Sequence, residues 1–181
     1  NYNYKFNQNY SKLHNWSIKN NKKFWSSVWD FANVRGIKSK KFKLTKNLID
    51  SKFFVNSKIN FAENLLAKKN KDNAITFISE NGYKETRSWK KLNSNTFKIT
   101  QFFKSINLKK GQRVAAYTPN IIQTVESFLA SSALGAIWSS CSPDFGVNGV
   151  IERFIQIKPS ILPELAASSA KLGYLSPTAL K

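Results

Sequence analysis

GQRVAAYTPNIIQTVESFLASSALGAIWSSCSPDFGVNGVIERF, residues 111–154, is the stretch that decides the expected fold. Residues 113–117 form a short apolar run of the kind that a buried parallel strand shows. After it, apolar residues recur at the three- and four-residue spacing of one helix face: Ile121, Ile122, Val125, Phe128, Leu129 and Ala133. We expect Asn120 to cap this helix and Gly135 to end it.

A second strand and helix follow with almost no slack between them. Residues 136–140 read as the strand, and Ser142-Pro143-Asp144 opens the helix, with Asp144 as its expected cap. One face of that helix is apolar and comprises Val147, Val150, Ile151, Phe154 and Ile157. Strands that alternate with helices over short connections indicate a right-handed βαβ unit, so the expected class is α/β with a parallel sheet.

The residues before this unit contain three further patterned segments. In residues 16–36, Ser17 is expected to cap a helix with an aromatic stripe, which Gly36 ends. That stripe either packs onto the main body or forms a ligand box, and packing is the favoured interpretation. Residues 74–88 read as a hairpin that turns at Asn-Gly, and residues 89–106 as an amphipathic helix. The inward positions of that helix are Leu92, Ile99, Phe102, Phe103 and Ile106.

The formal net charge of +19 raises the alternative of a nucleic-acid-binding module, but the composition favours another explanation. Of the 29 basic residues, 25 are Lys and only 4 are Arg, whereas base and phosphate recognition favours the Arg fork. Twenty Asn accompany the lysines, which is the residue set of A- and T-rich codons. We therefore favour scattered surface lysines over a dedicated nucleic-acid face.

Single residues exclude several other classes of protein. With one Cys and one His, an internal disulfide is impossible and a transition-metal site is not expected, and the reducing cytoplasm is the expected location. No apolar run approaches the ~20 residues of a membrane span, so no membrane association is expected. Because the sequence contains no Met, we expect it to be a fragment. We read His14 as an ordinary surface residue and Cys141 as a small buried thiol rather than a nucleophile.

Only one locus has the features of a ligand site. Residues 138–146, WSSCSPDFG, follow a parallel strand and precede a helix, which is where open α/β sheets bind ligands. Free backbone N–H groups at the start of a helix favour anions, and the small hydroxyl side chains allow close approach. The seven glycines show no phosphate-loop spacing, and no nucleophile elbow is present.

The sequence divides into three expected regions. Residues 1–70 form an N-terminal helical and loop extension, whose first 11 residues are expected to be poorly ordered. Residues 71–162 form the first part of the α/β domain. Residues 163–181 are an atypical tail without Asn, Phe or Ile, either a terminal helix and tail or a stretch read in another frame or joined from elsewhere.

The string GAIWSSCSPDFG at 135–146 resembles the acetoacetate–CoA ligases, a subfamily of the acyl-CoA synthetase, or adenylate-forming, superfamily. WSIKNNKKFWSSVWDF at 16–31 is similar to that family's N-terminal helical extension, and INFAENLL at 59–66 and ETRSW at 85–89 agree with it. The resemblance runs from about Leu13 to Leu162. From Pro163 onward we see no match.

The resemblance implies part of the AMP-binding α/β domain of an enzyme that activates acetoacetate with ATP and Mg and passes the acyl group to CoA. The family's phosphate loop and catalytic lysines have no counterpart here, so no catalytic residue is carried over, and the fragment alone is expected to be inactive and to bind no cofactor. By resemblance the loop lies near the CoA channel, which gives five candidate residues: Ser140, Ser142, Asp144, Gly146 and Arg153. Another short acid is the alternative substrate.

Overall fold

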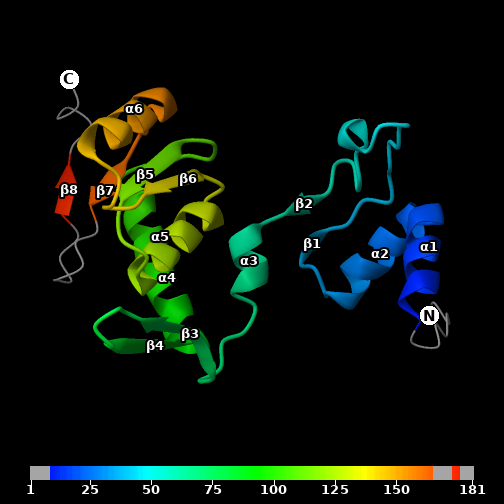
Figure 1. Cartoon of the computed structure of the whole chain (residues 1–181), viewed down its shortest axis with the longest axis horizontal. Coiled ribbons are helices and arrows are strands. Elements are labelled where there is room, and N and C mark those ends of the chain that lie inside the picture. Colours follow the sequence, from blue (N-terminus) through cyan, green and yellow to red (C-terminus); the bar gives the residue numbers. More distant parts are fainter. Residues whose placement is uncertain (1–8, 165–172, 176–181) are drawn as a thin grey trace. The chain divides into compact units, whose positions relative to one another are not determined.

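The computed structural model describes residues 9–164 and 173–175. These residues belong to two compact units, one of residues 1–59 and one of residues 60–181 (Figure 1). The predicted boundaries at residues 70 and 162 stay a prediction beside this division.

The first unit contains two helices, a short 3-10 turn and a two-stranded ladder. Its elements are α1 (Tyr10–Lys19), α2 (Asn21–Phe31), β1 (Gly36–Ile37), η1 (Leu48–Asp50) and β2 (Lys58–Ile59). The side chain of Asn9 caps α1 by accepting from the N–H of Lys12. The predicted cap at Ser17 is wrong, because Ser17 lies within α1 and its hydroxyl donates to the carbonyl of His14. The predicted end at Gly36 is also wrong, because α2 stops at Phe31.

The aromatic stripe of α2 packs inside this unit. The Trp29 ring lies 5.0 Å from that of Phe54, and Trp25 lies 6.0 Å from Phe53, between ring centroids. Phe42 completes the cluster, with its ring centroid 4.9 Å from that of Phe54. Aromatic pairs at these distances gain energy beyond the burial of their area. Because the partners of these rings are other side chains of the same unit, packing is favoured over a ligand box, whereas the predicted packing onto the main body stays a prediction.

The second unit begins with a short helix and a hairpin. α3 (Phe61–Leu65) is fastened by Asn60, whose side-chain amide donates to the carbonyl of Ser132 at 2.9 Å. β3 (Asn73–Ile78) and β4 (Lys84–Ser88) pair antiparallel around the predicted Asn-Gly turn, where Gly82 has a φ of +82°. The hairpin prediction is confirmed. α4 (Trp89–Ser105) follows directly, with Ser88 as its cap.

Within the described residues, the rest of the second unit consists of a four-stranded sheet and two helices. Its elements are β5 (Arg113–Tyr117), α5 (Ile122–Ala133), β6 (Ile137–Cys141), α6 (Val147–Ile157), β7 (Leu162–Glu164) and β8 (Gly173–Leu175). The strand order is β6-β5-β7-β8, and β5 runs parallel to both of its neighbours. The predicted βαβ unit is therefore confirmed. The final strand, β8, is antiparallel to β7.

The core follows the two-residue period of β5. Val114 packs with Phe103 of α4 and Ala130 of α5. Ala115 packs with Cys141 of the neighbouring strand β6 and with Phe154 of α6. Alternate side chains of a strand point to opposite faces, so α4 and α5 cover one face of the sheet and α6 covers the other (Figure 1). This is the arrangement that parallel strands require.

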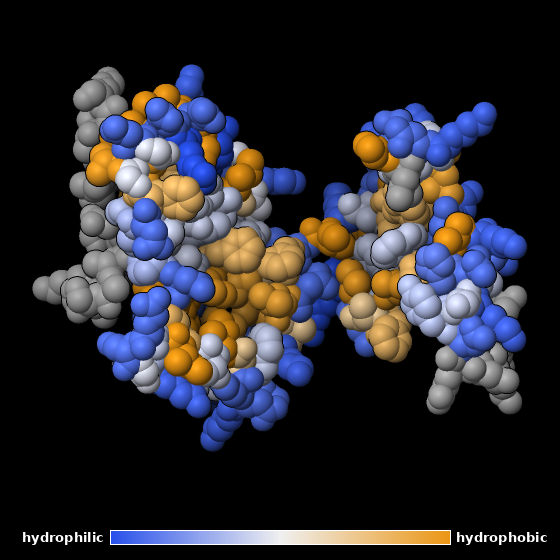
Figure 2. All heavy atoms as spheres, viewed as in Figure 1, coloured by the Kyte–Doolittle hydropathy of each residue, from blue (hydrophilic) through white to orange (hydrophobic). Residues whose placement is uncertain are grey.

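Apolar side chains also gather on the surface over α3 and α5 (Figure 2). Phe61 of α3, which is 58% exposed, lies 5.6 Å from Phe128 of α5 between ring centroids. Phe128 in turn meets Trp138 of β6 at 6.5 Å. The ring of Phe128 thus connects the helix layer to the sheet.

Several predicted details differ from the structure. Asn120 does not cap α5, whose N-cap residue is Ile121. Val147, Ile151 and Ile106 are exposed, although each was expected on an inward face. Val150 and Phe154 are buried as predicted, and Gly135 does follow the end of α5. Much of the predicted tail lies outside the described residues, and its described parts belong to strands β7 and β8 rather than to a helix.

Candidate functional site

The predicted ligand locus lies at the carboxyl edge of the neighbouring parallel strands β5 and β6, of which β6 is the edge strand of the sheet. Tyr117, the last residue of β5, stands opposite Cys141, the last residue of β6. The loop of residues 142–146 and the turn of residues 118–121 therefore leave the sheet at the same edge. Open α/β sheets bind ligands at this edge, so the loop lies where the sequence predicted a ligand site.

Residues of β5 fix the beginning of the loop. The phenolic oxygen of Tyr117 donates a hydrogen bond to the carbonyl oxygen of Pro143 at 3.0 Å. The backbone N–H of Thr118 donates to the carbonyl of Cys141, also at 3.0 Å. These two bonds join the last residue of β5 and the residue that follows it to the chain on either side of Ser142.

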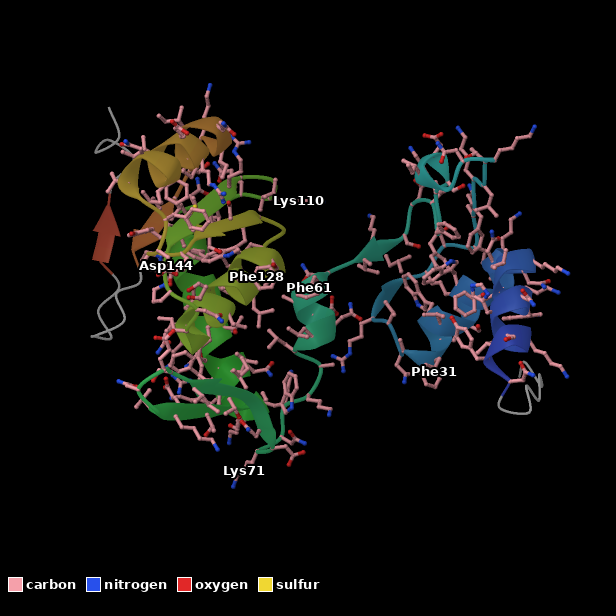
Figure 3. All side chains as sticks on the ribbon, viewed as in Figure 1. Phe31, Phe61, Lys71, Lys110, Phe128 and Asp144 are labelled. Carbon is pink, nitrogen blue, oxygen red and sulfur yellow. The ribbon has the colours of Figure 1, made fainter. Side chains whose placement is uncertain are left out.

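Bonds within the loop give it a turn conformation. The hydroxyl of Ser142 donates to a carboxylate oxygen of Asp144 at 2.6 Å, and the N–H of Phe145 donates to the Ser142 carbonyl at 3.1 Å. Asp144 is therefore engaged with Ser142, and its predicted role as helix cap is wrong. The N-cap residue of α6 is Gly146, and no side chain caps this end (Figure 3 labels Asp144).

Arg153 contacts the loop at the aromatic ring of Phe145. Its guanidinium carbon lies 4.5 Å from the ring centroid of Phe145, within the range of a cation–π contact. Arg153 comes from α6, whereas Phe145 precedes that helix. The resemblance pointed to Arg153 and the predicted locus contained Phe145, but the contact between the two is visible only in three dimensions.

The five predicted residues thus fall into three groups. Ser142 and Asp144 are hydrogen-bonded to each other, and Arg153 contacts the same loop through Phe145. Ser140 is exposed on β6, in register with the buried Ala116. Gly146 is exposed, and a Cβ placed on it would meet no atom within 4 Å. A ligand can therefore approach the Gly146 backbone closely, beside N–H groups that favour anions.

Residues of the kinds that often carry catalysis have structural roles here. Cys141 is a free and buried thiol, as predicted. His14 lies in α1, where its ring stacks on Tyr10 at 5.8 Å between centroids. Within residues 9–164 and 173–175, no cluster of three or more His, Cys, Asp or Glu side chains is arranged to hold a metal ion. In the same part of the chain, every helix is too short or too polar to cross a membrane.

A buried charged network escaped the sequence-based prediction. Glu126 of α5, only 3% exposed, accepts hydrogen bonds from Arg87 Nε at 3.2 Å and Asn95 Nδ2 at 2.8 Å. Arg87 is also paired with Glu85. Burial raises the pKa of Glu126, although Asn95 and Arg87 both act to lower it. Burial acts to lower the pKa of Arg87, but the bond to Glu85 and the two acidic charges outweigh it, so that pKa is raised.

Helical periodicity contained the signal for this network. Glu126 stands four residues after Ile122 and three before Leu129, within the buried stripe of α5. A carboxylate on such a stripe requires a buried partner. The network joins β4, α4 and α5, and none of its three residues is among the five predicted for the site.

The profile of the AMP-binding enzymes matches residues 62–167, which is more than half of the chain. The chain belongs to this family. The match continues past Leu162, so the expectation that all resemblance ends at Pro163 is wrong.

Within the family, the chain is similar to acetoacetyl-CoA synthetases. It is 37% identical to the enzyme of Rhizobium meliloti over 84% of this chain, and 38% identical to that of Xenopus tropicalis over 85%. It is also 32% identical to the malonamoyl-CoA synthetase of Penicillium aethiopicum over 84% of this chain. The predicted resemblance is confirmed.

The fold agrees with that of a solved relative. The acetoacetyl-CoA synthetase from Streptomyces lividans superimposes with a TM-score of 0.77 and 28% identity, over 84% of this chain. The matched part is 24% of that chain, and the chain likewise spans 24% of the Rhizobium and Xenopus enzymes. The predicted α/β class, as part of an adenylate-forming domain, is therefore confirmed.

Proposed function

We propose that this chain is the N-terminal part of an ATP-dependent ligase that converts acetoacetate, ATP and CoA to acetoacetyl-CoA, AMP and pyrophosphate. The observation that carries the proposal is the 37–38% identity to two acetoacetyl-CoA synthetases over nearly the whole described chain. The location that fits this activity and the single buried thiol is the cytoplasm.

The reaction has two steps. In the first, a carboxylate oxygen of acetoacetate bonds to the α-phosphorus of ATP, and pyrophosphate leaves. In the second, the sulfur of CoA bonds to the acyl carbon of the adenylate, the thiol proton is lost to a base, and AMP leaves. Both steps depend on groups that hold and neutralise phosphates in a fixed geometry.

Within this proposal, the chain serves the second step, the transfer of the acyl group to CoA. We assign Ser140, Ser142, Asp144, Gly146 and Arg153 to the wall of the CoA channel, around an approachable backbone at the start of α6. Mg enters the proposal as the ion that accompanies ATP and its phosphates. The catalytic residues lie outside the chain, and we assign none here.

A second acid is the alternative substrate, because a malonamoyl-CoA synthetase is 32% identical to the chain. Malonamate and acetoacetate both carry a carbonyl group two bonds from the carboxylate. Pockets separate such small differences by only about 10- to 200-fold, so the comparison must be made side by side.

The test is acid-dependent ATP–pyrophosphate exchange by a longer clone that contains this chain. Acetoacetate, malonamate, acetate, propionate and butyrate are each supplied at the same concentration. We expect acetoacetate to give the highest kcat/KM, and the 181-residue chain alone to give no exchange. A higher kcat/KM with another acid would reassign the substrate, and exchange by the chain alone would contradict the assignment of catalysis to residues outside it.

A further inference from the structure

The loop of residues 142–146 is held from two rigid elements. On the strand side, the Tyr117 hydroxyl donates to the Pro143 carbonyl at 3.0 Å. On the helix side, the Arg153 guanidinium covers the ring of Phe145 at 4.5 Å. The first contact holds the loop near its beginning and the second near its end. Both are separate from the hydrogen bonds within the loop.

Both contacts originate from well-packed supports. Tyr117 packs against a cluster of buried residues that includes Cys141, Val150 and Phe154. Arg153 directly precedes Phe154, which is 4% exposed and anchors α6 to the sheet. The ring of Tyr117 is partly buried in that cluster, so it loses little freedom when its hydroxyl makes a contact. Arg153 is exposed, and its long side chain loses more freedom when it covers Phe145.

We propose that Tyr117 and Arg153 are positioning residues, which hold loop 142–146 in the shape that receives CoA. Arg153 acts through Phe145 and not by binding a phosphate of CoA itself. The inference rests on the proposed function, since it concerns how the same loop serves the CoA step.

The test uses the longer clone and separates the two half-reactions. ATP–pyrophosphate exchange reports adenylation, and acyl-CoA formation at varied CoA concentration reports the second step. For Tyr117→Phe, which keeps the ring and removes the hydroxyl, we expect KM for CoA to rise about three- to tenfold with unchanged exchange. Tyr83→Phe is the matched control, because Tyr83 lies exposed in the turn between β3 and β4, and its KM stays at the wild-type value.

A double-mutant cycle tests the route through Phe145. We expect Arg153→Ala and Phe145→Ala each to raise KM for CoA by a similar factor, and the double variant to raise it no further. A double variant whose effect is the product of the two single effects would mean that Arg153 binds CoA directly, and would overturn its positioning role.

The remaining outcomes are distinguishable. If acyl-CoA forms but Tyr117→Phe has the wild-type KM for CoA, the inference about Tyr117 fails while the proposed function stands. If the Tyr117 and Arg153 variants lose exchange as much as acyl-CoA formation, their role is general folding and the inference also fails. If the unaltered longer clone forms no acyl-CoA with any acid, the proposed function fails, and the inference fails with it.

Discussion

Arg87 and Glu126 lie 39 positions apart and form a largely buried ion pair, with Arg87 Nε 3.2 Å from Glu126 Oε1. Asn95 Nδ2 donates to the same oxygen at 2.8 Å. The carboxylate of α5 thus collects donors from β4 and from α4. Because an unpaired buried charge is costly, this carboxylate fixes how the hairpin and both helices pack.

Loss of the cation should therefore destabilise the chain strongly. We expect Arg87→Met to lower the free energy of unfolding by about 3 kcal/mol, because it leaves the Glu126 carboxylate buried with one donor fewer. Lys38→Met is the control: it breaks an ion pair whose acid, Asp30, is 62% exposed, and should cost about 0–1 kcal/mol. Urea denaturation measures both variants, and equal losses would contradict the structural role of the buried pair.

Stability should also depend on pH through Glu126. Burial raises the pKa of Glu126 above its ordinary value of 4.5, so the folded state binds the proton more tightly than the unfolded state. The resulting stabilisation is fully present below pH 4.5 and is lost as the pH rises through the raised pKa. We expect the stability advantage of the wild type over Glu126→Gln to shrink as the pH rises to neutral. An advantage that instead grows with pH would mean that the Glu126 pKa is lowered in the folded state.

For a second buried group, the Ser127 hydroxyl of α5, we expect removal to leave stability unchanged or to increase it. The hydroxyl of Ser127 is buried without a hydrogen-bond partner, whereas that of Ser131 donates to the Ser127 carbonyl at 2.9 Å. Burying an unpaired hydroxyl costs about 1–3 kcal/mol, so Ser127→Ala should be neutral or stabilising by up to about 1 kcal/mol. Ser131→Ala, one helical turn away, loses a bond and should be destabilising. Thermal melts decide the order, and the reverse order would mean that Ser127 has a partner.

The sequence predicted the central βαβ unit because local patterns specify it. Apolar residues at every third or fourth position marked α5, and Gly135 marked its end. Caps were less predictable: Asn120 and Asp144 are both good capping residues, yet α5 starts after Ile121 and α6 after Gly146. In the case of Asp144, the hydroxyl of Ser142 competes successfully for the carboxylate.

Contacts between distant segments were beyond local patterns. Nothing in the spacing of Arg87 indicated that its guanidinium would meet Glu126. The contacts of the Tyr117 hydroxyl and of the Phe145 ring were likewise not predictable, because their partners come from other elements. The loop itself could be found, since its position after a parallel strand follows from topology.

The proposal that Gly146 lines the CoA channel is tested most directly by adding a side chain there. A Cβ at Gly146 meets no atom within 4 Å, and its φ of −58° suits any residue, so the free protein tolerates the change apart from a modest capping cost. In the longer clone, KM for CoA should be higher in Gly146→Val than in Gly146→Ala. We expect the rise in Gly146→Val to be about tenfold or more, which corresponds to the loss of one close contact with CoA. ATP–pyrophosphate exchange by the two Gly146 variants should stay at the wild-type value. Ser94→Val is the control, because Ser94 lies on the exposed face of α4, and its KM for CoA should stay at the wild-type value. A wild-type KM for CoA in Gly146→Val would contradict the assignment of this loop to CoA.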